Sequence, residues 1–259
     1  MELFNLSPDT MLSFFLTLFR ISIIVFLLPF FGGDSLPNML KAALCLVLTM
    51  AVWPHLSFPG EMFPGHPISI GVMLLGELIL GMVLGIVVEV IMGAVRTGGQ
   101  IIGFQMGFAM VSVVDPMTGT SQAVTAHFLY MVTLLSFLVL DGHLFLLKGL
   151  TMSFEYLPPG SLLLTPELGL DLLEYSDNMF LLAIKIAAPV MAALFLVDLA
   201  LALVGRASPQ MNVMMLGFPV KITVGFFFLG MIFTLMSLYI EDFIRMIEPM
   251  YENIMLTGS

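Results

Sequence analysis

Six long apolar runs constrain the fold of this chain more than any other feature of its sequence. A helix that crosses a bilayer needs about 20 mostly apolar residues. Runs of that kind lie at 11–31, 39–56, 68–95, 123–140, 178–204 and 211–240. Only 10% of the 259 residues are charged, whereas soluble domains carry about 25%. The sequence therefore predicts an all-α membrane-level protein with no separate soluble domain.

Several runs are too long or too interrupted to be straight spans. At the usual helical rise, the run 68–95 is about 42 Å long, which exceeds the hydrocarbon core of about 30 Å. Gly217-Phe218-Pro219 is predicted to kink or split the run 211–240, and Pro189 is predicted to do the same to the run 178–204. Basic residues fall at alternate turns, so the positive-inside rule predicts six spans with both ends outside.

Residues 96–122 form an apolar segment that is rich in helix breakers. Glycine lowers helix stability by about 1 kcal/mol per position, and proline by about 3. Asp115-Pro116 closes the helical part of the segment, and its glycines are Gly98, Gly99, Gly103, Gly107 and Gly119. Irregular backbone survives at membrane depth only inside protein or against a water-filled path. We therefore predict a broken, re-entrant piece over 98–114 that lines or blocks a passage.

Small residues recur at helical spacing. Gly81 and Gly85 are four residues apart, and the same spacing separates Gly99, Gly103 and Gly107. Such faces let helices approach closely. The spacing predicts tight helix packing and assembly rather than a lone protein in lipid.

Five ionisable side chains lie inside the apolar runs: Arg20, Glu77, Glu89, Lys185 and Asp198. A charge at the centre of a membrane helix costs about 3 kcal/mol on insertion scales, so such residues pair or face water. Both signs are present, which favours structural pairing between helices or between chains. The alternative is an ion-coupled secondary transporter that uses the three carboxylates of this set as a relay.

No pattern typical of a catalytic or metal site occurs. The four histidines are not arranged as metal ligands, and Cys45 is the only cysteine. Neither a GxxxxGK-type phosphate loop nor a GxSxG nucleophile motif is present. We expect no catalytic residue, no metal and no cofactor. The net charge of −10 argues against nucleic-acid binding.

Three strings are distinctive: GGQIIGFQMGFAMVSVVDP (98–116), DGHLFLLKGLTMSFEYLPPG (141–160) and VDLALALVGRASPQMNVMMLGFPVKITVG (197–225). Together with Arg20, Pro29 and Pro37, they resemble the FliR family of flagellar export-gate proteins. That family is related to the SctT proteins of virulence type III secretion. The resemblance extends over essentially the whole chain, and the third string favours the flagellar branch.

The resemblance implies a non-enzymatic subunit of the flagellar type III export gate, in the bacterial inner (cell) membrane and the flagellar basal body. Such a subunit assembles with FliP-like and FliQ-like subunits into a closed channel that passes unfolded flagellar proteins. FlhB-like and FlhA-like export components and the lipid membrane are further implied partners. Within a single export-gate domain, 1–259, about 1–177 would be FliP-like and about 178–249 a FliQ-like helical hairpin.

Two segments are expected to carry the function. The family's plug loop corresponds to about 106–122 and would seal the channel through Met106, Gly107, Phe108, Met110, Val113, Asp115, Pro116 and Met117. The turn over 205–219 places polar groups at a helix break beside an apolar hairpin, and such groups need partners when they are buried. We expect it to contact other subunits through Arg206, Pro209, Gln210, Gly217, Phe218 and Pro219.

Overall fold

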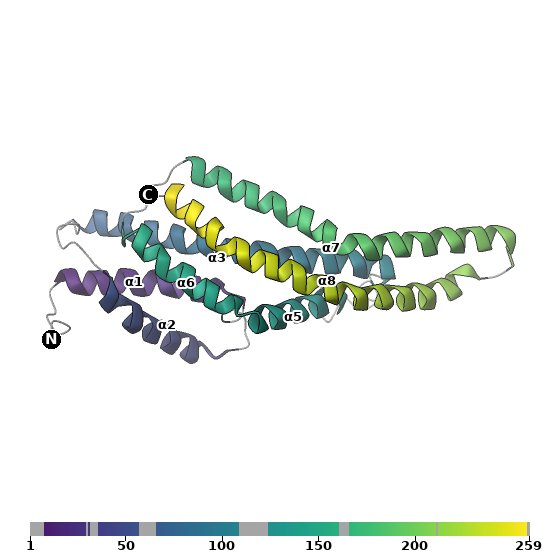
Figure 1. Cartoon of the computed structure of the whole chain (residues 1–259), viewed down its shortest axis with the longest axis horizontal. Helices are drawn as coiled ribbons and strands as arrows, with labels where there is room; N and C mark the ends of the chain where they lie inside the picture. The colour runs from purple at the N-terminus through teal and green to yellow at the C-terminus, as the bar shows by residue number, and fades with distance from the viewer. Residues whose placement is uncertain are drawn as a thin grey trace. The chain divides into compact units, whose positions relative to one another are not determined.

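The structure is a computed structural model that describes residues 8–29, 31, 36–56, 66–108, 124–160, 166–210 and 212–257. Over these residues the regular structure is helical, which confirms the predicted all-α fold (Figure 1). The elements are α1 (Pro8–Leu27), α2 (Asn38–Val52), the short 3₁₀ helix η1 (Trp53–His55), α3 (Pro67–Met106), α5 (Val124–Val139), α6 (Gly142–Tyr156), α7 (Pro166–Ala207) and α8 (Val213–Thr257).

Four of the described helices are long and apolar enough to cross a membrane. The candidate spans are Thr10–Leu27, Pro67–Met106, Ser176–Ala207 and Met215–Thr234, and α5 with α6 gives a fifth if this bent pair is one span. The predicted six spans are therefore too many for the described residues. The difference arises because α2 has only 15 residues, about 22 Å at the usual rise, which is shorter than the hydrocarbon core.

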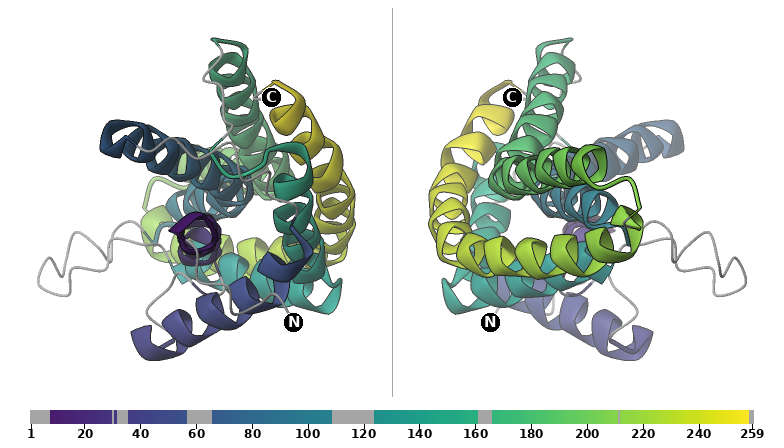
Figure 2. Two further views of the ribbon diagram at one scale, coloured as in Figure 1. Left: turned by 90° about the vertical axis from the view of Figure 1, so that its left-hand side faces the viewer. Right: turned by 90° about the vertical axis from the view of Figure 1, so that its right-hand side faces the viewer.

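The chain divides into two units. The first comprises 1–90, 141–175 and 243–259, and the second 91–140 and 176–242. The first holds α1, α2, α6, the N-terminal part of α3 and the C-terminal end of α8. The second holds the C-terminal part of α3, α5 and most of the α7–α8 hairpin, which Figure 2 shows in its right-hand view from the end where the two helices are joined. The predicted division into FliP-like and FliQ-like portions stays a prediction.

In the first unit, α3 packs closely on α1 at two glycines. A β-carbon at Gly81 would lie 2.8 Å from a methyl carbon of Ile23, and one at Gly85 would lie 2.5 Å from Leu27. The four-residue spacing of the two glycines thus places both contacts on one face of α3. α2 also packs on α1, which is seen nearly end-on in the left-hand view of Figure 2.

In the second unit, α3 runs unbroken through Gly98, Gly99 and Gly103, so the predicted break over this part of the segment is wrong. A β-carbon at Gly98 would lie 3.0 Å from the backbone oxygen of Ala183 in α7, and one at Gly99 would lie 2.5 Å from the Cα of Ala126 in α5. The glycines therefore admit neighbouring backbones. This packing outweighs the weak helix propensity of glycine, as tertiary context commonly does.

The helix ends at Met106, about two turns after Gly98, where the predicted broken piece begins. Gly107 has a φ of +92°, a conformation that glycine adopts without steric cost. Its N–H donates to the carbonyl of Phe104, and the N–H of Phe108 donates to the carbonyl of Gly103, at 3.1 and 3.0 Å. These two bonds form a Schellman motif, which satisfies the last carbonyls of α3. The residues of the predicted broken piece that follow, 109–114, lie outside the described residues.

The two predicted interruptions of the hairpin do not end a helix. Pro189 lies inside α7, which continues to Ala207. Gly217, Phe218 and Pro219 lie in the first turns of α8, so the predicted split of the run 211–240 is wrong. Pro219 is the seventh residue of α8, beyond the four N–H groups that have no partner within a helix, so it removes one backbone hydrogen bond and the helix continues past it.

We expect Gly99→Ala to destabilise the protein, because the added methyl would meet backbone atoms that cannot rotate away. Overpacking of this kind costs about 1–3 kcal/mol. Gly71→Ala is the matched control on the same helix, since its β-carbon would meet nothing within 4 Å and alanine favours a helix by about 0.5–1 kcal/mol. Thermal unfolding of the purified protein in detergent checks this. Equal unfolding temperatures for the two variants would contradict the packing role.

Candidate functional site

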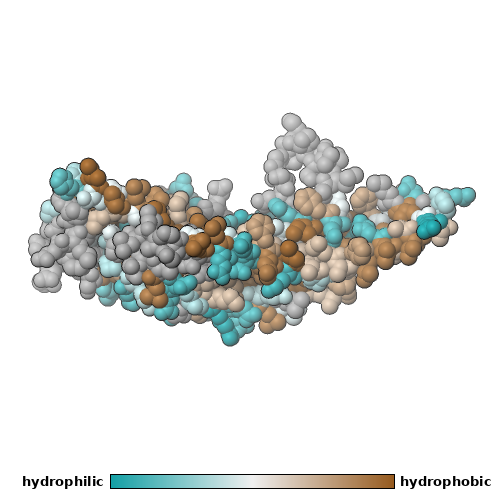
Figure 3. Space-filling model, turned by 90° about the horizontal axis from the view of Figure 1, so that it is seen from above, coloured by the Kyte–Doolittle hydropathy of each residue, from teal (hydrophilic) through white to brown (hydrophobic). Residues whose placement is uncertain are grey.

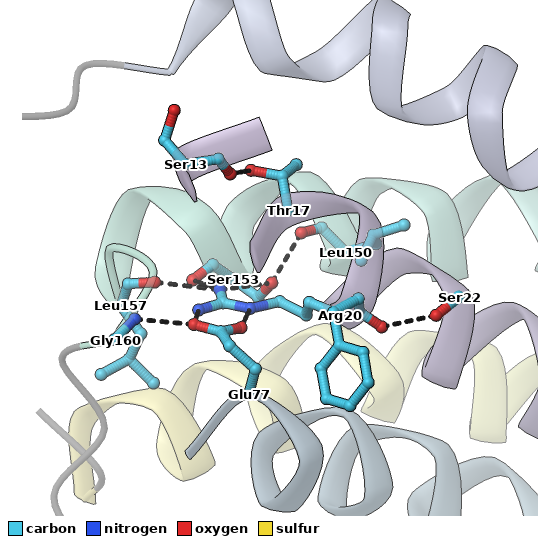
Figure 4. A network of polar contacts seen from close by, with 10 residues as sticks. Ser13, Thr17, Arg20, Ser22, Glu77, Leu150, Ser153, Leu157 and Gly160 are labelled. Atoms are coloured by element: carbon cyan, nitrogen blue, oxygen red, sulfur yellow. Dashed lines mark hydrogen bonds and ion pairs between the residues drawn. The ribbon is translucent and has the colours of Figure 1, made fainter. Parts of the chain in front are cut away.

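A buried ion pair lies at the centre of a polar network in the first unit (Figure 4). Arg20 of α1 and Glu77 of α3 each expose only 1% of their side-chain area. Arg20 donates from Nε to Glu77 Oε2 at 2.5 Å and from Nη2 to Glu77 Oε1 at 2.9 Å. The pair is therefore bidentate, the geometry in which arginine and carboxylate bind most strongly.

The other end of the same guanidinium caps the C-terminus of α6. Arg20 Nη1 donates to the carbonyl oxygens of Ser153 and Leu157, both at 2.9 Å. The last carbonyls of a helix have no partner within it, and a positive charge there is favourable. The Phe154 ring centroid lies 4.4 Å from Arg20 Cζ, a distance at which a cation attracts an aromatic face.

Glu77 holds the turn that follows α6. The backbone N–H of Gly160 donates to Glu77 Oε1 at 2.7 Å. Gly160 has a φ of +86°, and a β-carbon there would lie 2.5 Å from Met73 of α3. The ion pair thus connects α1 and α3 to both sides of the turn over 157–160. Its three hydrogen bonds make Glu77 a structural acceptor in this arrangement.

Tyr251 of α8 makes a second buried connection in the first unit. Its hydroxyl donates to the carbonyl oxygen of Leu84 in α3 at 2.9 Å. A β-carbon at Gly149 of α6 would lie 2.2 Å from the Tyr251 ring, so the ring fits only against a glycine. Burial raises the pKa of the Tyr251 hydroxyl, which keeps it a donor.

Three residues of the predicted plug are described, and they lie against α8 in the second unit. Met106 is fully buried, and a β-carbon at Gly225 would lie 2.7 Å from its side chain. The ring of Phe218 lies 2.8 Å from the position of a β-carbon on Gly107. Phe108 meets Phe226 edge to face, with ring centroids 6.3 Å apart. Met110, Val113, Asp115, Pro116 and Met117 lie outside the described residues.

The predicted contact turn is polar and exposed at its tip. Arg206, Pro209 and Gln210 are exposed, and so is Pro219. Gly217 is buried, and a β-carbon there would lie 3.3 Å from Leu201 of α7. Phe218 is half-buried on Gly107, so the structure brings one predicted contact residue to the base of the predicted plug.

The remaining predicted charges behave differently from Arg20 and Glu77. Glu89 is half-buried and has an interaction partner. Lys185 and Asp198 are exposed in this chain rather than buried, because the faces of α7 that carry them are uncovered. Asp198 pairs with Lys221 of α8 at 2.5 Å, a partner that the sequence analysis did not single out.

Sequence reasoning also missed the groups that complete the buried network. Ser153 and Leu157 contribute backbone oxygens and Gly160 a backbone N–H, and backbone groups give no signal in a sequence. Phe154 and Tyr251 are ordinary aromatic residues of apolar helices. In the described residues, no group of three or more His, Cys, Asp or Glu could hold a metal ion. The arrangement is suited to fixing helices in place, and it contains no constellation for bond chemistry.

Comparison with known proteins gives a consistent result. A model of the family "Bacterial export proteins, family 1" matches residues 11–247. Flagellar biosynthetic protein FliR of Bacillus subtilis is 33% identical over 96% of this chain and 97% of its own length. FliR of Escherichia coli is 31% identical over 88% of this chain and 87% of its own length. Surface presentation of antigens protein SpaR of Salmonella typhimurium is 28% identical over 78% and 75%.

We expect Glu77→Gln and Arg20→Met each to destabilise the first unit strongly, because either change leaves a buried charge without its counter-charge. Loss of one partner of a buried pair costs about 3–5 kcal/mol. Asp198→Asn is the control, because its pair is 48% exposed on the aspartate side and exposed pairs contribute about 0–1 kcal/mol. Chemical denaturation of the purified protein in detergent measures all three.

The double variant Arg20→Met/Glu77→Leu separates pairing from general damage. Removing both charges leaves no stranded ion, so this variant should lose less stability than the sum of the two single losses. Additive losses would show that the two side chains act independently.

Proposed function

Because the chain belongs to the family of bacterial export proteins, family 1, we propose that it is a membrane subunit of the flagellar protein-export apparatus. The observation that carries the proposal is the family match over residues 11–247, which includes helices of both units. The names of the FliR relatives give the flagellar assignment. The subunit acts without bond chemistry of its own, as a structural part of the passage.

The uncovered apolar surface of the second unit supports an assembly with other membrane subunits. In the most apolar stretch of α7, only 28% of the residues are buried, and in that of α8 only 22%. The corresponding share for α3 is 61%. Figure 3 shows hydrophobic residues along the hairpin and hydrophilic residues at its joined end. Exposed apolar area of this extent marks a protein or membrane contact. We propose FliP-like and FliQ-like subunits as the protein partners, with FlhB-like and FlhA-like components beyond them, in the inner membrane at the basal body.

The geometry at the end of α3 supports a plug whose chain leaves the helix at Gly107. The Schellman motif fixes the direction in which the chain leaves α3, and Phe218 and Phe226 hold its first two residues. We propose that residues 106–122 seal the passage and that unfolded flagellar proteins pass when the seal opens.

The secondary-transporter alternative is not favoured. A relay needs carboxylates that can release and accept protons or ions, but Glu77 accepts three hydrogen bonds and Asp198 is paired with Lys221. The match to an export family likewise gives the transporter no support.

An in-frame deletion of the gene tests the function. The deletion strain should make no flagella and export no flagellar protein to the medium, and a plasmid copy of the gene should restore both. Affinity purification of a tagged chain in mild detergent should recover FliP-like and FliQ-like subunits. Recovery should fall for Arg206→Ala with Gln210→Ala if the turn over 205–219 is a subunit contact. A deletion strain that swims normally would refute the proposal.

Deletion of 108–113 tests the plug. Because these residues follow the end of α3, their removal should leave the purified complex assembled and make the membrane leak ions or small solutes. Ion conductance of proteoliposomes, or solute uptake by intact cells, measures the leak. A deletion of five residues at 161–165, in the connection before α7, controls for a general effect of chain shortening. An assembled complex with normal export and no leak would exclude the plug role.

A further inference from the structure

Lys185 is a cation on an otherwise apolar, uncovered face of α7. The helix segment that contains it, Ser176–Ala207, has a mean hydropathy of 2.4 over its best window. Next to it along the helix, Leu181 and Ile184 expose 50% and 58% of their area. Ala188, one turn further, is exposed as well. An ammonium group in such surroundings is costly once the face is covered, unless an anion meets it.

The two charged residues of this segment, Lys185 and Asp198, differ in whether the chain supplies a counter-charge. Asp198 has its counter-charge within the hairpin, from Lys221. Lys185 has none: among the described residues, no ion pair or hydrogen bond holds its ammonium group.

The depth of Lys185 favours a protein carboxylate over a lipid phosphate. Lipid phosphates lie at the boundary of the apolar zone, where a lysine would have polar neighbours on one side. Toward the N-terminal end of α7, the first exposed polar side chains on this face are those of Asn178 and Glu174, about 10 and 16 Å from Lys185 along the helix. Exposed apolar side chains continue on the other side to Leu203, which is 62% exposed. Lys185 thus lies inside the exposed apolar stretch, about 10 Å from its polar N-terminal end, which is further than a lipid phosphate at the boundary would require.

We propose that the Lys185 face of α7 docks an apolar helix of another membrane subunit and that this helix presents a carboxylate to Lys185. The flanking apolar side chains supply the contact area, and Ala188 allows the partner helix to come close. The charge pair sets the register, because a shift along the helix would leave both ions unpaired. The inference rests on the proposed function in one respect, which is that the chain has a partner subunit in the membrane.

Carbodiimide treatment of native membranes tests the pair directly. The reagent joins an amine to a carboxylate that touches it, with loss of water, and adds no spacer. Peptide mass spectrometry should find Lys185 joined to an Asp or Glu of a different membrane protein. Lys185→Arg is the matched control, because it keeps the charge but its guanidinium does not form the amide. It should retain the partner and lose the cross-link.

Loss of the charge should weaken the complex. With Lys185→Met, which keeps the length and apolar stem of the side chain, recovery of the cross-linked partner should fall by about tenfold or more. The Lys185→Glu variant should lose the partner. Changing the cross-linked acidic residue of the partner to lysine in the same strain should restore the contact, because the two charges are then exchanged.

Three results would overturn the inference. They are a cross-link from Lys185 only within its own chain, no Lys185 cross-link to another chain, and undiminished partner recovery with Lys185→Met. If Lys185→Met instead lowers the amount of copurified anionic phospholipid and spares the protein partner, the anion is a lipid phosphate. The cross-linking experiment does not depend on whether the chain takes part in export. A deletion strain that still swims would refute the proposed function, and the cross-link would still test the Lys185 pair.

Discussion

A single buried ion pair defines how three helices of the first unit meet. Arg20 and Glu77 are almost completely removed from water, so every donor and acceptor of the pair needs a partner inside the protein. Those partners are backbone groups at the end of α6 and in the turn after it. Because the two ions and the turn satisfy one another, displacing any one of these elements would strand a charge. The network therefore gives directional specificity to apolar helices that could otherwise slide.

The same residue types have different roles in the two units, and burial is what separates them. In the first unit the arginine–glutamate pair is enclosed by the chain itself. In the second unit the Asp198–Lys221 pair is only partly covered, with 48% and 24% of the two side chains exposed. A pair that water can reach contributes little to stability. Its value lies in cancelling two charges on a hairpin that is otherwise apolar on its outer faces, which lowers the cost of covering those faces.

Hydropathy predicted the long helices and missed α6, which lies outside the six apolar runs. It did not predict where each helix ends or what holds the helices together. Glycine propensity predicted a break near Gly98, because propensity measures an isolated helix. In the folded chain, the missing β-carbons let α5 and α7 come within contact of α3, and the helix continues to Met106. The need for counter-charges could likewise be predicted, since charges in apolar runs must be met. The pairing of Arg20 with Glu77, 57 residues away, could not, because spacing along the sequence carries no information about contacts between helices. The network also depends on backbone groups of the turn over 157–160, and a sequence does not show which backbone groups will serve as hydrogen-bond partners.

The uneven burial of similar helices shows which part of the chain is stabilised from within. The best windows of α3 and α7 have mean hydropathies of 2.6 and 2.4, yet 61% of the first and 28% of the second are buried. Hydrophobic stabilisation follows the area removed from water rather than the hydropathy of the sequence. α3 obtains that stabilisation inside the chain, from α1, α5 and α7. The outer faces of α7 and α8 obtain theirs only from whatever surrounds the protein. Substitutions along α3 should therefore act on the stability of the chain itself. Substitutions on the outer faces of the hairpin should act on the contacts the chain makes and leave its own fold intact.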